Sequence, residues 1–510
     1  MSGHGKRKGT AFLSPDLVRA VLKGHSALGL AFAAILYLVC LTGAVSVFAY
    51  EFQRWENPNV PRSTAMSADA VQAAYRAGLA RAGGAPEHVF ILLPSADKPW
   101  PTVRIDGSDG GRTTWIADGQ GRLVGEMKEN WSWFIARLHI NLHLPQRWGI
   151  LIVGLAGVAL LSSLISGVLA HPRIFRDAFH LRLGGSRRLQ EVDLHNRIGI
   201  WALPFHITVS LTGALLGLSS IIIGAIGLVV FNGDTAKVYA IFTPPHPVED
   251  ARLAPALDLR PLYAATMAQA PGGRINYVTV EHPLEQGAAA VFEVDDGSSR
   301  LANADTYSFD RTGRLYHLRK AASNNLGQQI LDSLGPLHFG WFGGGAIKII
   351  YSLLGIGLAY LAAGGVHIWL ARRHDKGRPT PTWERVWAAC VWGQPMALSA
   401  AALASVIWAF QAATVWTWMI ASVVAVVAAG FFTPVGLSRL ARLATGTVLV
   451  LTVVSHLLLT MPGDPVALVM DGALALIGAG LLATCSGRLG RIYRQRRGAV
   501  REASVEANAG

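Results

Sequence analysis

Two apolar segments of this chain carry the same motif at the same spacing. Each begins with a histidine, has a glycine four residues later and has a Leu-Thr-Gly triplet at offsets +16 to +18. A chain that repeats such a segment in like orientation places the two histidines at equal depth on opposite sides of a pseudo-two-fold axis. That placement suits the two axial positions of one haem. The two copies are His25, Gly29, Leu41, Thr42 and Gly43, and His195, Gly199, Leu211, Thr212 and Gly213.

The composition is typical of a polytopic membrane protein. Hydrophobic residues make up 51% of the 510 residues and charged residues only 15%. About 20 apolar residues cross the hydrocarbon core of a bilayer, and eight segments of this kind occur. The net charge of +13 does not indicate nucleic-acid binding, because Lys and Arg gather in short loops at one set of helix ends.

These basic loops predict the topology. If the loops and both termini are cytoplasmic, the eight spans alternate consistently and two long insertions fall on the periplasmic side of a bacterial inner membrane. The predicted segments are a basic N-terminus 1–24, TM1 25–51, a first outer domain 52–136, TM2 137–171, a cytoplasmic loop 172–194, TM3 195–231, a second outer domain 232–337, TM4 338–371, a linker 372–385, a TM5–TM8 block 386–487 and a basic tail 488–510.

The two insertions resemble each other. Each begins with a helix-like stretch, continues with strand-like runs and closes with the turn sequence Asp-x-x-Gly-Arg-Leu, at 118–123 and again at 310–315. The repeated unit is therefore a helix, an outer α/β domain and a second helix, in two parallel copies. The expected fold is a polytopic α-helical membrane protein of about eight helices with two periplasmic α/β domains and a C-terminal four-helix membrane block.

The three cysteines exclude several kinds of site. Cys40, Cys390 and Cys485 all lie in or at the end of apolar segments, and none is near another in the sequence. They provide no disulfide framework, no zinc site and no CxxCH attachment for a covalent haem. A haem in this chain would be held without a covalent bond, as a haem b.

Four histidines in matching places are the candidate haem ligands. His25 and His195 open the first and third spans, whereas His139 and His338 precede the second and fourth, each in a Leu-His pair. The repeat pairs His25 with His195 at an inner haem and His139 with His338 at an outer haem. Two imidazoles leave no iron position for oxygen, which favours electron transfer. A histidine at a membrane interface is also a common anchor, and transition-metal transport is the rival use of the set.

Four other histidines remain as alternative ligands. One lies a helical turn beyond His139 and shares its face if that stretch is helical. Another lies 11 residues beyond His195, deep in the third span, where an ionisable group indicates function although the first span has no counterpart. The last two close the second and fourth spans. The alternatives are, in chain order, His143, His171, His206 and His367.

Haem propionates require cationic or hydrogen-bonding partners near the membrane edge. Arg137 and Arg197 lie within two residues of candidate ligands, and Arg147 is another outer-edge candidate. Each of the three equally suits a topological or interfacial role. The remaining histidines, His456 among them, are interpreted as ordinary surface or loop residues.

The motif set resembles a known family. The Leu-His-x-x-x-Gly…Leu-Thr-Gly pattern at 194–213, its relaxed copy at 25–43, Leu138-His139 and the run 337–340 are similar to the PepSY-associated transmembrane family, over about residues 15–375. This family includes inner-membrane ferrisiderophore reductases and iron-regulated membrane proteins. The resemblance implies PepSY-like outer domains and a four-helix core with haem b. It places the ligands on His25, His139, His195 and His338.

The resemblance also implies the reaction. Electrons would pass from a quinol or a redox protein through the inner and then the outer haem to a ferric siderophore in the periplasm, releasing Fe(II). No nicotinamide or flavin motif, Walker A sequence or nucleophile elbow occurs. Two alternatives remain: a non-redox PepSY-type regulator of periplasmic proteases or peptide sensor, and a siderophore or metal permease. The sequence gives residues 383–487 no role beyond quinone binding or partner docking.

Overall fold

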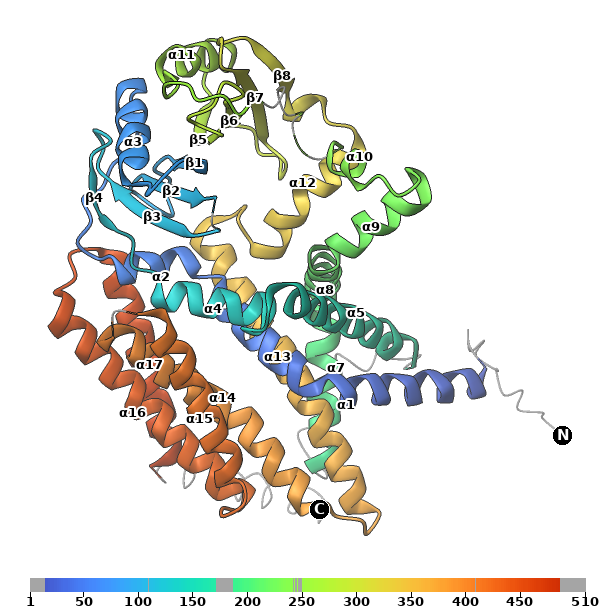
Figure 1. The fold of residues 1–510 in the computed structure, drawn as a ribbon. Helices are drawn as coiled ribbons and strands as arrows, with labels where there is room; N and C mark the ends of the chain where they lie inside the picture. Colours follow the sequence, from blue (N-terminus) through green and yellow to red (C-terminus); the bar gives the residue numbers. More distant parts are fainter. Residues whose placement is uncertain are drawn as a thin grey trace, which may run out of the picture.

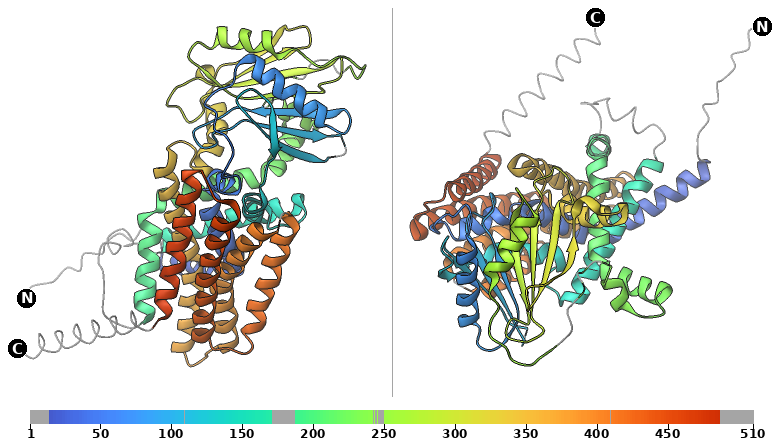
Figure 2. Two further views of the ribbon diagram at one scale, coloured as in Figure 1. Left: turned by 90° about the vertical axis from the view of Figure 1, so that its left-hand side faces the viewer. Right: turned by 90° about the horizontal axis from the view of Figure 1, so that it is seen from above.

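The protein combines a bundle of long apolar helices with a β-sheet domain at one end (Figures 1 and 2). The computed structural model describes residues 14–486 except 109, 171–186, 242, 244, 246–249 and 409. Within these residues, seven helices are long and apolar enough to cross a membrane, and a bent pair of helices would make an eighth span. The chain is thus a multi-pass membrane protein with a sheet domain. The seven are α1 (Pro15–Ser46), α5 (Gln146–Ala170), α13 (Gly344–Asp375), α14 (Pro381–Ile407), α15 (Gln411–Ala428), α16 (Pro434–Thr460) and α17 (Pro465–Cys485).

The segment 195–231, predicted as one span, is divided in the structure. It contributes to α7 (Arg187–Trp201), α8 (Leu203–Gly217) and α9 (Ser219–Val230), and α7 and α8 meet at 72°. Pro204 lies in the first turn of α8. Its ring removes a backbone donor and obstructs the preceding turn, so a continuous helix cannot pass through this point.

The outer candidate ligands do not open spans either, although TM2 was predicted from 137 and TM4 from 338. His139 lies on the separate helix α4 (Asn130–Asn141) and His338 on α12 (Leu326–Phe339). The first helix is ended by Leu142 and His143, whose φ angles are 57° and 54°, and the second by Gly340 at 71°. Left-handed residues reverse the chain direction, so each histidine stands on a helix that turns away from the span after it.

The two outer domains, predicted as separate, form one antiparallel sheet of eight strands in the order β4-β3-β2-β1-β5-β6-β7-β8. The halves join where β1 pairs with β5, with Val89 opposite Val280 and Ile91 opposite Val278. The strands are β1 (Pro86–Leu92), β2 (Thr102–Gly107), β3 (Arg112–Ala117), β4 (Leu123–Glu126), β5 (Arg274–Glu281), β6 (Ala289–Asp295), β7 (Ala304–Asp310) and β8 (Leu315–Arg319).

The repeated turn sequence forms the same β-hairpin turn in both halves. Asp118 accepts a backbone bond from Gly121 before β4, and Asp310 accepts one from Gly313 before β8. The two glycines have φ angles of 82° and 83°. A glycine is required at both places because other residues rarely adopt that conformation.

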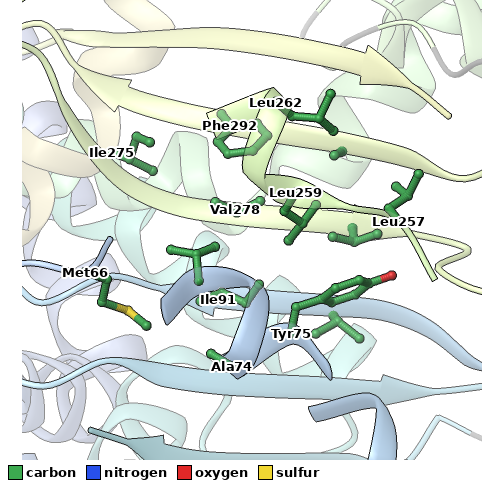
Figure 3. Packing of buried hydrophobic residues seen from close by; sticks show 14 of the residues in the cluster. Met66, Ala74, Tyr75, Ile91, Leu257, Leu259, Leu262, Ile275, Val278 and Phe292 are labelled. Carbon is green, nitrogen blue, oxygen red and sulfur yellow. The ribbon is translucent and has the colours of Figure 1, made fainter. Parts of the chain in front are cut away.

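One apolar core unites the halves of the sheet (Figure 3). Helices α3 (Ala68–Arg81) and α11 (Leu259–Gln269) pack on the same face of it. The buried Gln72 side chain joins the halves, because its amide donates to the Leu257 carbonyl at 3.1 Å and accepts from the Leu259 amide at 2.6 Å. Fully buried core residues from both halves are Val71, Tyr75, Val89, Ile91, Leu259, Val278, Val280 and Phe292.

The helices fall into two groups. Helices α1, α5, α7, α8 and α13 contact one another in a core bundle, and α14–α17, named here the C-terminal block, pack beside it. The short helix α2 (Ala49–Glu56) and α4 lie where the sheet domain, the core bundle and the C-terminal block meet (Figure 1). The remaining short elements are α10 (Thr235–Tyr239), which follows α9, and the 3-10 turn Ala321–Ser323.

Candidate functional site

The structure brings His139 and His338 together at the sheet end of the core bundle. Their ring centres are 6.1 Å apart, with an angle of 27° between the ring planes. Helix α4 places its histidine against α1, and α12 places its histidine against α8. These two residues are 199 positions apart in the chain, so only the folded structure brings the rings together.

The glycine of each Leu-Thr-Gly triplet makes room for one of these rings. A Cβ atom on Gly43 would lie 2.7 Å from Cε1 of His139, and a Cβ atom on Gly213 would lie 2.8 Å from Cε1 of His338. Both distances are too short for a carbon–carbon contact. The glycine of each triplet therefore leaves the space that one outer imidazole ring occupies.

Hydrogen bonds orient both outer rings in the same way. Nδ1 of His139 lies 2.9 Å from the Val39 carbonyl oxygen, so it donates. Nδ1 of His338 lies 3.0 Å from the Thr212 hydroxyl oxygen. That hydroxyl donates to the Thr208 carbonyl at 2.7 Å and therefore accepts from the ring. In both histidines the proton is on Nδ1, which leaves the lone pair of Nε2 available for a metal.

The inner histidines occupy the other end of the core bundle. His25 lies fourteen residues before Val39 on α1, about 21 Å at 1.5 Å per residue. Its Nδ1 is 2.9 Å from the Ser163 carbonyl oxygen, again the pattern that leaves Nε2 available. Nδ1 of His195 is buried and has no hydrogen-bond partner in the described part of the chain. The two inner histidines are close enough to interact electrostatically.

Glycines also flank the inner rings. A Cβ atom on Gly167 of α5 would lie 3.3 Å from Cε1 of His25, and one on Gly364 of α13 would lie 3.6 Å from Nδ1 of His195. Each inner histidine thus faces a glycine of the span that follows in its half. No sequence pattern selects these two glycines, because their contacts depend on how the helices pack.

The alternative ligands fare differently. His143 does not share a helical face with His139, because α4 ends before it, and its Nε2 donates to the Phe134 carbonyl at 2.9 Å. His206 is completely buried, with the backbone of Leu354 and Gly199 beside its ring. His367 lies within α13, and His171 falls outside the residues that the structure describes.

The three arginine candidates lie in different surroundings. Arg137 lies over the Trp133 ring, 5.4 Å from its centre, whereas Arg147 is exposed at the start of α5. Arg197 is only 6% exposed and lies two residues after His195 on α7. Of the three it is the one that is buried.

Two protein ligands are all that a haem requires, because the porphyrin supplies the other four. The described residues contain no group of three or more His, Cys, Asp and Glu side chains placed to hold a bare metal ion.

Comparison with known proteins agrees with the motif set. The family model described as the PepSY-associated TM region matches residues 22–372. The chain belongs to this family. The match spans α1 to α13 and includes all four candidate ligands, whereas the C-terminal block lies beyond it.

One curated relative of this PepSY-associated protein is an uncharacterized protein of Pseudomonas aeruginosa. The two are 31% identical over 249 residues, which are 46% of this chain and 63% of the relative. The alignment therefore spans less than two thirds of the relative.

Proposed function

We propose that this protein is a haem b-containing electron-transfer protein of the bacterial inner membrane. Its axial ligands would be His139 with His338 at an outer haem and His25 with His195 at an inner haem. The observation that carries the proposal is the outer pair, in which two rings face each other and both Nε2 atoms are left free by the Nδ1 hydrogen bonds.

The distance between the outer rings fits a shared iron. Imidazole nitrogens bind metals at about 2 Å, so two rings on opposite sides of one iron have centres about 6 Å apart. The observed separation is 6.1 Å. Two histidines packed for other reasons would have no need of this separation or of matching tautomers.

The protein's own groups would perform three tasks. The Val39 carbonyl and the Thr212 hydroxyl hold the outer imidazoles in one tautomer, and the Ser163 carbonyl does the same for His25. The triplet glycines fix the depth of the outer rings. A bound haem would supply a centre that accepts and donates single electrons, and Arg137, Arg147 and Arg197 are the candidate partners of its propionates.

We further propose that the acceptor is a ferric siderophore or a similar ferric chelate on the periplasmic side. One electron reduces Fe(III) to Fe(II), which hard oxygen ligands bind more weakly, so the chelator releases the iron. The sheet domain stands at the same end of the molecule as the outer pair. This position supports a role for the sheet domain in guiding the acceptor toward the outer haem. A quinol or a redox protein would supply the electron at the inner pair, with both termini cytoplasmic.

The test is the optical spectrum of the detergent-purified protein, oxidised and then reduced with dithionite, with a pyridine haemochrome count. We expect a b-type spectrum with about two haems per chain. His338→Ala should remove about one of them, and so should His195→Ala. The matched control is His143→Ala, which lies four residues from His139 but has its Nε2 bound by a carbonyl, and it should keep both.

The possible results separate the readings. A single haem in the wild type would leave one of the two pairs without a role. A colourless protein from haem-replete cells would contradict the redox function and favour a PepSY-type regulator, in which the histidines are structural.

A further inference from the structure

Helix α2 joins four parts of the molecule. It has only eight residues, yet it contacts α13, α4, α16 and the N-terminal end of α17. Glu51 binds the buried amino group of Lys348 on α13 at 2.7 Å. The C-terminal side of α2 supplies Arg54, Trp55 and Glu56, whose contacts run toward the C-terminal block and α4.

Arg54 connects α2 to the start of α17. Its guanidinium binds both carboxylate oxygens of Asp464, at 2.9 and 2.8 Å, and the two residues are 8% and 4% exposed. Asp464 also caps α17 by accepting from the Val466 amide at 2.8 Å. A two-point bond between buried charges fixes direction as well as distance, so α2 and α17 are held in one relative orientation.

Trp55 makes a second connection, to the interior of the C-terminal block. Its indole nitrogen donates to Asp471 at 2.8 Å, and its ring stacks on His456 with centres 4.4 Å apart. Nδ1 of His456 lies 2.9 Å from Asp471, and Nε2 lies 2.8 Å from the Trp55 carbonyl oxygen. Both ring nitrogens thus lie within hydrogen-bond distance of an oxygen atom. His456 is thus not the ordinary surface or loop residue that the sequence indicated: it is 2% exposed.

Glu56 carries the connection on to α4. Its carboxyl group accepts from the Trp131 amide at 2.5 Å and from the amide and hydroxyl of Ser132 at 3.1 and 2.5 Å. These donors lie in the first turn of α4, where backbone amides have no partner within the helix. Seven residues after Ser132, the same helix carries His139.

Apolar packing follows the same route. One buried cluster combines side chains of α2 and α4 with three helices of the C-terminal block, and Trp418 of α15 packs on Phe134 with ring centres 6.2 Å apart. Six of the twelve residues of α4 are buried. The cluster includes Phe52, Trp55, Trp131, Phe134, Ile135, Leu138, Leu398, Ala401, Ala402, Ala467 and Met470.

The helix that carries the opposite ligand is less buried. None of the fourteen residues of α12, which carries His338, is buried. Its polar contacts include Thr212 with His338 at 3.0 Å, the Tyr351 hydroxyl with the Leu337 carbonyl at 2.8 Å, and Arg319 and Asn324 with Asp332 at 2.9 and 3.0 Å. Helices with few buried apolar contacts open at lower free energy than well-packed ones. The two halves of the outer pair therefore differ in rigidity.

We propose that the C-terminal block is the device that positions His139. It acts through α2, with Arg54–Asp464 and Trp55–Asp471–His456 as positioning residues. As a result, His139 stands on the more rigid helix and His338 on the more mobile one. The effect on haem rests on the proposed function, whereas the mechanical connection does not. The inference gives a role to the part of the chain that lies outside the family match.

The experiment compares full-length Asp471→Asn and Asp464→Asn with Thr452→Val. The control lies on α16 with His456 and is completely buried, but its hydroxyl binds only the Val448 carbonyl of its own helix. The first readout is hydrogen–deuterium exchange. Because the connection from the C-terminal block to α4 is weakened, exchange in α4, residues 130–141, should rise about tenfold in both Asn variants. Exchange in α12, residues 326–339, should not change, and the control should match the wild type in both helices.

The second readout is a redox titration followed optically. In the Asn variants the midpoint potential of one haem should shift while the other stays at its wild-type value, because only the outer pair loses its positioning. If Asp471→Asn does not assemble, Arg54→Lys replaces it. This variant keeps the charge but breaks the two-point bond to Asp464, so it tests the same connection between α2 and the C-terminal block.

Each outcome has a distinct meaning. Unchanged exchange in α4, residues 130–141, in folded variants would overturn the proposed connection between the C-terminal block and α4, whether or not haem is bound. Increased exchange with both potentials unchanged would overturn its effect on the ligand. A colourless wild type would contradict the proposed function, and the exchange result would still decide the mechanical connection.

Discussion

At the scale of single residues, the triplet glycines have the sharpest requirement. Gly43→Ala and Gly213→Ala each place a methyl group against a histidine ring, at 2.7 and 2.8 Å. Because neither ring can move without losing its Nδ1 hydrogen bond, we expect both variants to contain about one haem per chain in place of two. Gly480→Ala, a change at a glycine with nothing within 4 Å of the added carbon, should retain both. Full haem content in both triplet variants would disprove the packing argument.

Thr212 acts on His338 through a hydrogen bond and not through packing, because its hydroxyl faces Nδ1 of the ring. Thr212→Val removes the hydroxyl that faces His338 Nδ1 and leaves the Val209 carbonyl as a partner of the ring, and loss of a partner of this kind weakens metal binding by about 10- to 100-fold. The measurement is haem retention during dilution in detergent. The matched control is Thr42→Val at the equivalent place of the first copy, where the hydroxyl binds only its own helix. Equal haem loss in the two variants would speak against the assignment.

At the scale of elements, Gln72 tests whether the sheet is one unit. Its amide satisfies a buried carbonyl and a buried N–H of the other half. Gln72→Leu leaves both unsatisfied, which destabilises the sheet domain by about 1–3 kcal/mol for each group. The melting temperature of the domain, followed by tryptophan fluorescence, should fall. Gln286→Leu, at an exposed position of the same domain, should leave it unchanged, and two independent melting transitions would indicate separate halves.

Elements also show where sequence patterns were sufficient. The hydrophobic runs predicted the spanning helices, and the repeated Asp-x-x-Gly-Arg-Leu sequence predicted the two hairpin turns, because helix length and turn conformation depend on nearby residues. The ends of the helices were harder. Leu142 and His143 adopt left-handed conformations between α4 and α5. Pro145, directly before α5, is a local signal for this break, and the prediction of one continuous span from 137 did not use it.

At the scale of the whole molecule, the charge distribution predicts which end faces the periplasm. Thr312→Cys, on the exposed hairpin turn between β7 and β8, should react with a membrane-impermeant maleimide in intact cells. Lys376→Cys, exposed after α13 at the other end, should react only after permeabilisation. The unmodified protein is the control for its own three cysteines, of which none is exposed. The reverse labelling pattern would invert the topology and with it the direction proposed for electron flow.

The sequence by itself determined the class of the protein and its family, and it predicted four histidines as candidate ligands. Hydropathy, charge placement and a repeated spacing are properties of short segments, and they survive in any fold that the chain adopts in a membrane. The resemblance to the PepSY-associated family rested on the same segments, and the family match confirms it.

The tertiary structure decided everything that depends on residues meeting across the chain. It paired β1 with β5, turned His143 away from its neighbour and brought the rings of His139 and His338 within 6.1 Å. It also joined Arg54 to Asp464 across 410 positions. Such contacts follow from the packing of whole helices against one another. A local sequence pattern does not identify the distant residue with which a side chain will be in contact.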